Sequence, residues 1–336
     1  MDFNLSETQG MLRDTLRRYL ADKYDHDSRM KVVRSDAGWS QASWKAFAEE
    51  LGILAAPFSE DLGGLGGGAV DNMIVMEELG GKLVIEPYLS TVVIGGGFAR
   101  ETGNADLVGK IIGGEVTTAF AAYEPKGRFD LAHVETTAKP DGDGFVLNGD
   151  KAVVRDAPFA SHLFVTARTP GGISLFLVDS ATSGIVRRDY PTVDGSRASE
   201  IHFDGVRVPA ADMLGAPGEA FVVAQVRLGG GRVHHAMRTI GLAQKALDAL
   251  CERALSRHTQ GSALADKQMV QEKIADSWLE LEQFRLLVMR TAWRIDRYQD
   301  YQKVRKDIAA VKVAMPRVYH DVVQRAMHLH GALGIS

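Results

Sequence analysis

The first third of the chain carries apolar residues at helical spacing. Ser6-Glu7-Thr8-Gln9 has capping-box spacing and leads into a stripe of Met11, Leu12, Leu16, Tyr19 and Leu20. Two shorter stripes follow, from Trp44 to Leu51 and from Val70 to Leu79, and each is ended by glycine. The pattern predicts an N-terminal α-helical domain over residues 1–112 with glycine-rich connections.

The period changes after Gly113-Gly114. Turn signals at Asp141-Gly142-Asp143-Gly144 and Asn148-Gly149-Asp150 separate short runs rich in β-branched and aromatic residues. The spacing is typical of a sandwich or barrel, and the runs are Thr117–Ala122, Val134–Ala138, Phe145–Leu147, Lys151–Val154, His162–Thr166, Ile173–Val178, Ile185–Tyr190 and Ser199–Val208. No long helical pattern interrupts them, which argues against a parallel βαβ sheet. We therefore predict a central antiparallel β-barrel or sandwich over residues 113–218.

Helical spacing returns from about Glu219 in three long stretches: Ile240 to Leu255, Met269 to Ile295, and Val304 to about Leu329. Helices of this length must bury broad apolar stripes against one another. The prediction is a C-terminal antiparallel four-helix bundle over residues 219–336. The fold class is therefore multidomain α+β, in the order α block, β block, α bundle.

Composition narrows the function classes. The 336 residues are 45% hydrophobic and 24% charged, the balance of a soluble globular protein. A net charge of -4 gives no electrostatic footprint for nucleic acid. The single cysteine, Cys251, excludes an internal disulfide and a thiolate zinc site. The polar N-terminus lacks an apolar leader and no window suits a bilayer, so we expect a cytoplasmic protein without membrane insertion.

Two local motifs have simpler explanations than the chemistry they imitate. Gly64–Ala69 satisfies a dinucleotide-binding pattern, but no βαβ unit surrounds it, and a loop between helices is the better interpretation. His234 and His235 are helix neighbours that point about 100° apart and cannot share one metal ion. His328 and His330 lack carboxylate ligands at suitable helical spacing. We expect no metal site.

Several strings, in order and spacing, resemble the acyl-CoA dehydrogenase family over essentially the whole chain. They are Leu51–Pro57 with Gly63–Gly66, Glu77–Gly80, Phe145–Lys151, Val206–Pro209 with Leu214-Gly215, Ala243–Leu247, and Arg257 with Gly261. The N-terminal two thirds, especially Glu124–Leu131, look most like the small subunit of pimeloyl-CoA dehydrogenase. From Leu228 to His235 onward the chain looks more like a branch in which the dehydrogenase domain is fused to other modules.

The resemblance implies FAD between the β domain and the C-terminal bundle, with its adenine end crossing to a neighbouring subunit. A family flavin loop aligns with Tyr123–Asp130, which keeps Glu124 but loses two hydroxyls, although Tyr123 brings one back. Phe129 and Arg232 match substrate-binding positions. The family's aromatic wall and hydroxyl near flavin N5 align with Val153-Val154-Arg155. Arg155 either stabilises a reduced flavin by charge or fills its space, and the sequence does not choose.

The diphosphate end of the cofactor is matched better. Arg257 aligns with the family arginine that reaches the diphosphate, for which a planar, bidentate guanidinium is suited. The alternative for Arg257 is a salt-bridged helix end. Gln268 aligns with a second position, and His328 and Gly331 align with a glycine-rich loop at the flavin dinucleotide, where His328 replaces a glutamine.

The catalytic base is not found. One family branch places a glutamate at the position of Gly231, and the others place a carboxylate after the glycine-rich loop, past Ser336. His235 and His330 are the weak candidates, because imidazole accepts a proton near neutral pH.

Three functions stay open. The first is an FAD-dependent acyl-CoA dehydrogenase, a homodimer or homotetramer that passes electrons to an electron-transfer flavoprotein. The second is a catalytically incomplete subunit that completes the flavin site of a second acyl-CoA dehydrogenase chain. The third is a flavin oxidase or monooxygenase on the same fold, and fold alone does not separate them.

Overall fold

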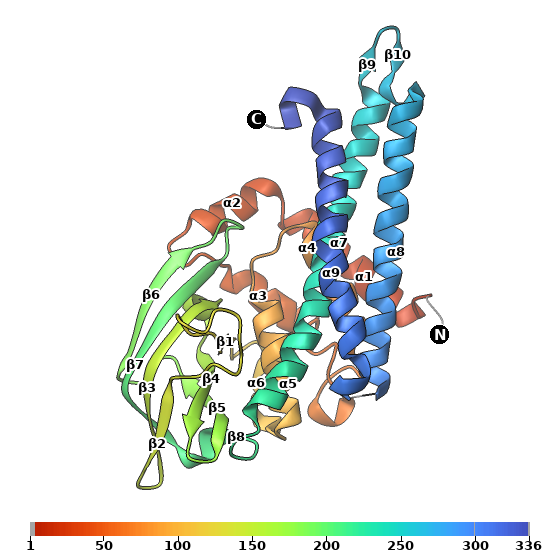
Figure 1. The fold of residues 1–336 in the computed structure, drawn as a ribbon. Helices are drawn as coiled ribbons and strands as arrows, with labels where there is room; N and C mark the ends of the chain where they lie inside the picture. The colour runs from red at the N-terminus through yellow and green to blue at the C-terminus, as the bar shows by residue number, and fades with distance from the viewer. Residues whose placement is uncertain (1–3, 299, 335–336) are drawn as a thin grey trace. The chain divides into compact units, whose positions relative to one another are not determined.

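A computed structural model describes residues 4–298 and 300–334. Figure 1 shows the order of helices, then strands, then long helices along the chain. The helices before the sheet are α1 (Glu7–Lys23), α2 (His26–Arg34), α3 (Gln41–Glu49), α4 (Ala69–Gly81), the π-helix η2 (Leu89–Gly95), α5 (Gly96–Glu101) and α6 (Ala105–Ile112). The sequence prediction of helices at the N-terminus is confirmed, and Ser6 caps α1 through the predicted capping box with Gln9.

The chain forms two compact units that do not follow sequence order. One unit, called the helical unit here, comprises residues 1–25, 67–84 and 232–336; the other, the β unit, comprises residues 26–66 and 85–231. Residues 1–112 therefore contribute to both units.

The helical unit contains α1, α4 and the long helices α7 (Ala220–Ser256, from Arg232 onward), α8 (Gln268–Tyr298) and α9 (Tyr301–His330). Of the three long helices, α8 and α9 lie side by side (Figure 1). The buried positions of the three helices include Ile240 and Leu247 on α7, Leu281 on α8, and Ile308 on α9, which match the predicted apolar stripes. A short hairpin of β9 (His258–Thr259) and β10 (Ser262–Ala263) joins α7 to α8.

Two helices cross backbone to backbone in this unit. A Cβ atom on Gly241 of α7 would overlap the carbonyl oxygen of Glu77 on α4 and lie 2.9 Å from its carbonyl carbon. A Cβ on Gly80 of α4 would in turn overlap the carbonyl oxygen of Arg238. Arg285 of α8 forms an ion pair with Glu77 beside this crossing. Glycine is required here for close approach rather than for turning.

The β unit contains an eight-stranded sheet in the order β6-β7-β3-β2-β4-β5-β8, with β1 paired to β4. The strands are β1 (Thr118–Ala121), β2 (Thr137–Asp141), β3 (Gly144–Arg155), β4 (His162–Thr169), β5 (Gly172–Asp179), β6 (Ile185–Pro191), β7 (Arg197–Pro209) and β8 (Met213–Leu214). Each predicted run overlaps one of these strands, but Phe145–Leu147 and Lys151–Val154 are parts of the single strand β3, and β2 begins only at Thr137. The sheet is mixed rather than antiparallel throughout, because β1 and β2 both run parallel to β4.

The sequence prediction of a turn at Asn148-Gly149-Asp150 is wrong. The pairing of β3 with β7 continues on both sides of it, so β3 is one strand with a bulge between Leu147 and Gly149. The Asn148 side-chain oxygen accepts from Gly205 N at 2.8 Å, and a Cβ on Gly149 would lie 2.6 Å from Thr136 Cα. Glycine is used here for a bulge and a close backbone contact. The other predicted turn, at Asp141–Gly144, does join β2 to β3.

The helices of the β unit are held by buried polar contacts. The Trp44 indole on α3 donates to Gly114 O at 3.1 Å, and the Tyr88 hydroxyl donates to Ile53 O at 3.2 Å. Gly64–Gly68 connects η1 (Glu60–Leu62) to α4, so the interpretation as a loop between helices is confirmed. Among the described residues, no helix combines the length and the apolar character that a membrane span needs.

Candidate functional site

The loop between β1 and β2, residues 122–136, carries two of the predicted site residues. Tyr123 is half-buried at its start, and Phe129 is 86% exposed near its tip. The two rings meet edge to face with centroids 5.9 Å apart. Arg128 beside Phe129 adopts a left-handed backbone with φ 51°, which is uncommon for a residue other than glycine. The loop thus presents an aromatic pair to solvent in a defined conformation.

Glu124 is buried at the base of this loop and all its oxygens are occupied. One carboxylate oxygen, Oε1, accepts from Lys151 Nζ at 2.8 Å and from Thr136 N at 3.0 Å. Oε2 accepts from Glu135 N at 2.5 Å. Burial raises the pKa of Glu124, but the Lys151 charge and these hydrogen bonds outweigh it, so the pKa is lowered overall. Glu124 is therefore an anion in the folded chain.

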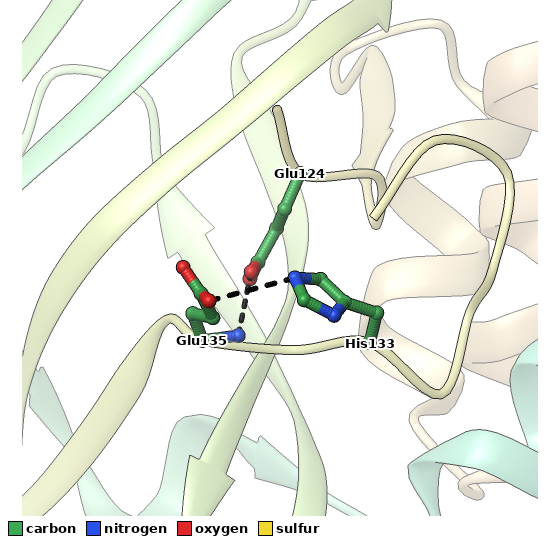
Figure 2. A group of neighbouring side chains, drawn as sticks. All are labelled: Glu124, His133 and Glu135. Atoms are coloured by element: carbon green, nitrogen blue, oxygen red, sulfur yellow. Dashed lines mark hydrogen bonds and ion pairs between the residues drawn. The ribbon is translucent and has the colours of Figure 1, made fainter. Parts of the chain in front are cut away.

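Figure 2 shows Glu124 beside His133 and Glu135, a group with metal-ligand chemistry. Their ligand atoms lie within 4.8 Å of one another. However, Glu124 is already paired with Lys151, and Lys126 Nζ lies 3.2 Å from Glu135 Oε2. Two ammonium groups on two of the three ligands disfavour a cation, so this cluster is better explained as an ion-pair network that orders the loop.

A second bulge in β3, between Lys151 and Val154, lies next to the β1–β2 loop. The pairing with β7 shifts between Lys151 and Val154, and Ala152 N donates to Tyr123 O at 2.8 Å instead. Val153 has φ 52° and is 54% exposed, although a β-branched residue strongly disfavours this backbone conformation. Such strain persists only where surrounding contacts impose it. Val153 is therefore an exposed residue that directly follows Ala152, the residue hydrogen-bonded to Tyr123.

Arg155, at the end of the same strand, forms an ion pair with Asp194 at 3.1 Å. Both side chains are about half exposed, with 49% and 46% of their surface accessible. The pair reduces the net positive charge that Arg155 offers to a neighbouring group. The structure thus places Tyr123, Glu124 and Phe129 in the β1–β2 loop, and Arg155 at the end of β3 in the same sheet, paired with Asp194.

Arg257 and Gln268 flank the β9–β10 hairpin in the helical unit. Arg257 is exposed, and its guanidinium has no hydrogen bond or ion pair within residues 4–298 and 300–334. The alternative of a salt-bridged helix end is therefore not what the structure shows. Gln268 begins α8 and donates to Glu272 at 2.9 Å. An exposed, unpaired guanidinium suits an anionic ligand with two oxygens.

The remaining predicted residues also lie in the helical unit. His328, His330 and Gly331 form the end of α9, which in Figure 1 lies toward the same end of the long helices as the β9–β10 hairpin. His330 Nδ1 lies 2.8 Å from Ala326 O, so Nδ1 carries the proton in the neutral ring. Arg232 is exposed and His235 half-buried on α7. The sequence-predicted residues thus lie in three places: on the β unit, at the end of the long helices that carries the β9–β10 hairpin and the end of α9, and on α7.

Sequence reasoning missed the role of Lys151. Its side chain is fully buried, and burial lowers its pKa to about 8 despite the opposing charge of Glu124. The available signal was a lysine inside a strand whose neighbouring inward positions, Leu147 and Val154, are apolar. A lysine at such a position requires a buried acidic partner.

Comparison with known proteins agrees along the whole chain. Models of the N-terminal, middle and C-terminal domains of acyl-CoA dehydrogenases match residues 6–99, 119–206 and 218–336. An (R)-benzylsuccinyl-CoA dehydrogenase of Thauera aromatica is 30% identical over 366 aligned positions, covering 100% of this chain and 89% of the relative.

Two solved structures share the fold. Butyryl-CoA dehydrogenase of Megasphaera elsdenii matches with a TM-score of 0.91 and 26% identity, over 100% of this chain and 91% of that one. A structure of PigA with FAD and proline matches with a TM-score of 0.90 and 25% identity, over 100% and 90% of the two chains. From the domain matches, the identity over the full length and the shared fold, this chain belongs to the acyl-CoA dehydrogenase family, whose members are flavoprotein oxidoreductases acting on CH-CH groups.

Proposed function

We propose that this protein uses FAD to dehydrogenate an acyl-CoA thioester to the 2,3-enoyl-CoA. The observation that carries the cofactor assignment is Arg257, an exposed guanidinium without an acidic partner in the described part of the chain. It stands where the family arginine reaches the diphosphate, with Gln268 beyond the hairpin. Because no acidic side chain of the described residues occupies it, the planar guanidinium is available for bidentate binding of a phosphate.

The residues of the β unit, taken by themselves, offer the chemistry that a flavin ring needs. A flavin ring is planar, largely apolar and bordered by hydrogen-bonding atoms. Tyr123, Phe129 and Val153 supply an exposed apolar region, and the Tyr123 hydroxyl supplies a polar group at its edge. The donor set therefore fits FAD. Bound there, FAD would supply the acceptor for the hydrogen that leaves the β carbon as hydride.

The chain's own residues then have three tasks: to hold the cofactor, to orient the thioester and to accept the α proton. Arg257 and Gln268 are proposed for the first, Phe129 and Arg232 for the second. For the third, His330 has the more suitable protonation pattern, since Nδ1 donates to its own helix and leaves Nε2 as the acceptor of the neutral ring. The assignment of His330 remains a prediction, as does that of His235.

A second function is favoured by one observation. The exposed positions that a flavin would contact carry Val153 and Arg155 rather than an aromatic wall and a hydroxyl, and Arg155 is already paired with Asp194. Such a chain is suited to complete the flavin site of a second acyl-CoA dehydrogenase chain while performing no turnover itself. The partner in this case is a heteromer subunit; in the first case it is a second copy, with an electron-transfer flavoprotein as acceptor.

Purification of the full chain separates these functions. A yellow protein that retains FAD and is bleached anaerobically by an acyl-CoA, with butyryl-CoA and benzylsuccinyl-CoA as the first probes, supports dehydrogenation. A folded, colourless protein that takes up FAD only when a second dehydrogenase chain is added supports the incomplete subunit. Bleached protein that recovers its colour in air faster than it reduces an electron-transfer flavoprotein instead supports an oxidase or monooxygenase.

A further inference from the structure

A buried ion pair ties both ends of the β1–β2 loop to the sheet. Lys151 Nζ on β3 donates to Glu124 Oε1 at 2.8 Å and to Thr166 Oγ1 on β4 at 3.1 Å. Glu124 stands at the beginning of the loop, and its carboxylate accepts from Glu135 N and Thr136 N at the end of the loop. One carboxylate and one ammonium group therefore close the segment from residue 124 to residue 136.

The closed loop holds the aromatic pair in place. Tyr123 directly precedes Glu124, and its carbonyl accepts from Ala152 N, the residue after Lys151. Within the loop, His133 packs so close to Gly127 that a Cβ there would lie 2.7 Å from the imidazole. Phe129 leans on Tyr123 from the tip. The Lys151–Glu124 pair and the β3 bulge are thus adjacent parts of one arrangement.

Two further contacts near the tip of the loop add little to its attachment to the sheet. The Lys126–Glu135 ion pair is 76% and 56% exposed, and an exposed pair of this kind stabilises little. Asp130 accepts from Ala132 N at 2.9 Å, which orders one turn but does not connect the loop to the sheet. Arg168 on β4 also holds the end of the loop, with Nε donating to Val134 O at 3.0 Å and its backbone N donating to Thr136 O at 2.8 Å. Among these contacts, the buried pair is the one that joins the beginning of the loop to its end as well as to the sheet.

The energetics point to geometry rather than stability as the purpose. A buried ion pair roughly offsets its own desolvation cost, and apolar residues of the same volume often stabilise a fold as well or better. An apolar pair, however, has no donors and acceptors to direct at Glu135 N, Thr136 N and Thr166 Oγ1 together. The directional hydrogen bonds of Lys151 and Glu124 therefore fix the position of the loop ends on the sheet, which Leu and Met at these positions would not do.

We propose that Lys151 and Glu124 are positioning residues: they hold residues 122–136 as a preformed wall for the flavin ring and so set the affinity for FAD without touching it. This inference rests on the proposed use of FAD. Glu124, expected from the sequence among the cofactor-binding residues, then acts through the loop that it closes.

Glu124→Gln is the principal test, because it keeps the shape of the side chain and removes its charge. We expect the Kd for FAD, measured by quenching of flavin fluorescence, to rise about tenfold or more. The reason is that the charge-assisted hydrogen bond between Lys151 and Glu124, which preforms the loop for the flavin ring, is lost. In the protein without FAD, we expect chymotrypsin to cleave after the exposed Phe129 several times faster. Lys126→Met, which breaks the exposed pair of the same loop, should leave both values within about twofold.

Thr166→Val provides a second variant that removes one hydrogen bond from Lys151 with little change in volume, in case Glu124→Gln does not fold. Each variant is compared at a temperature at which its circular dichroism matches that of the wild type. A lower melting temperature with unchanged cleavage and unchanged affinity would show a purely structural pair and overturn the inference. Faster cleavage with unchanged affinity would also overturn it, because the loop would then not serve the cofactor.

Failure of the proposed function is recognised separately. If the wild-type chain binds no FAD, alone or with a second dehydrogenase chain, then the assignment of the cofactor is wrong. The cleavage rates still decide whether the pair holds the loop, since they need no cofactor.

Discussion

Gly241→Ala tests the backbone contact between α4 and α7 in the helical unit. The added methyl group would overlap the carbonyl oxygen of Glu77 and lie 2.9 Å from both Glu77 C and Gly81 N. Backbone atoms on both sides cannot rotate away, so α4 and α7 must separate. Such overpacking costs about 1–3 kcal/mol, while the better helix propensity of alanine returns at most about 1 kcal/mol.

The matched control is Gly10→Ala on α1, where a Cβ would meet no atom within 4 Å. It retains the gain in helix propensity without the overlap, so it should stabilise the chain by up to about 1 kcal/mol. Because the gain in helix propensity is common to both variants, they should differ by the overpacking cost alone, about 1–3 kcal/mol in the free energy of unfolding, measured by urea denaturation followed by far-UV circular dichroism. Equal stability of the two variants would refute the backbone contact between α4 and α7.

Three further predictions concern the site. Arg257→Ala should raise the Kd for FAD about tenfold or more, since a charge-assisted hydrogen bond to a phosphate is lost. Arg317→Ala, which removes another exposed arginine on α9, should leave the Kd unchanged. Equal effects of the two variants would refute the assignment of Arg257 to the diphosphate. Val153→Gly should stabilise the β unit by about 1 kcal/mol in urea unfolding, because glycine adopts a φ of 52° without the strain that valine has there. Val186→Gly, at an exposed strand position with ordinary φ, should destabilise it, and the reverse order would contradict backbone strain at Val153. Burial lowers the pKa of Lys151 from 10.5 to about 8 in the folded chain. Between pH 8 and pH 10.5 the unfolded chain therefore binds more protons than the folded chain, so the free energy of unfolding of the wild type, relative to that of Lys151→Met, should rise by about 3 kcal/mol over this range. A difference between the two proteins that does not depend on pH would contradict the burial of Lys151.

The hydrophobic pattern predicted most of the elements because apolar spacing is a local property. The stripes on α7, α8 and α9 and the runs of the β unit could be recognised without tertiary information. The bulge at Gly149 could not, because Asn-Gly-Asp has the same local chemistry in a turn and in a strand. Only the approach of Thr136 and the continued pairing with β7 distinguish the two.

The site could be predicted residue by residue but not as an arrangement. The family resemblance named Tyr123, Glu124, Phe129 and Arg155, and the structure places the first three in one loop of the β unit and Arg155 at the end of β3. The family resemblance did not reveal that Glu124 forms a buried ion pair with Lys151, because that pairing joins residues 27 positions apart across the sheet. Nor does sequence indicate a left-handed valine at Val153, since the surrounding contacts impose it.

We propose that this chain holds FAD and uses it to oxidise an acyl-CoA. The most direct test of this proposal is the absorbance spectrum of the purified protein, reconstituted with FAD and mixed anaerobically with a panel of acyl-CoA thioesters. The account predicts a bound flavin that is bleached by at least one thioester, with the matching 2,3-enoyl-CoA as product. A folded protein that binds no FAD by itself or with a second dehydrogenase chain, or a bound flavin that no acyl-CoA reduces, would contradict it.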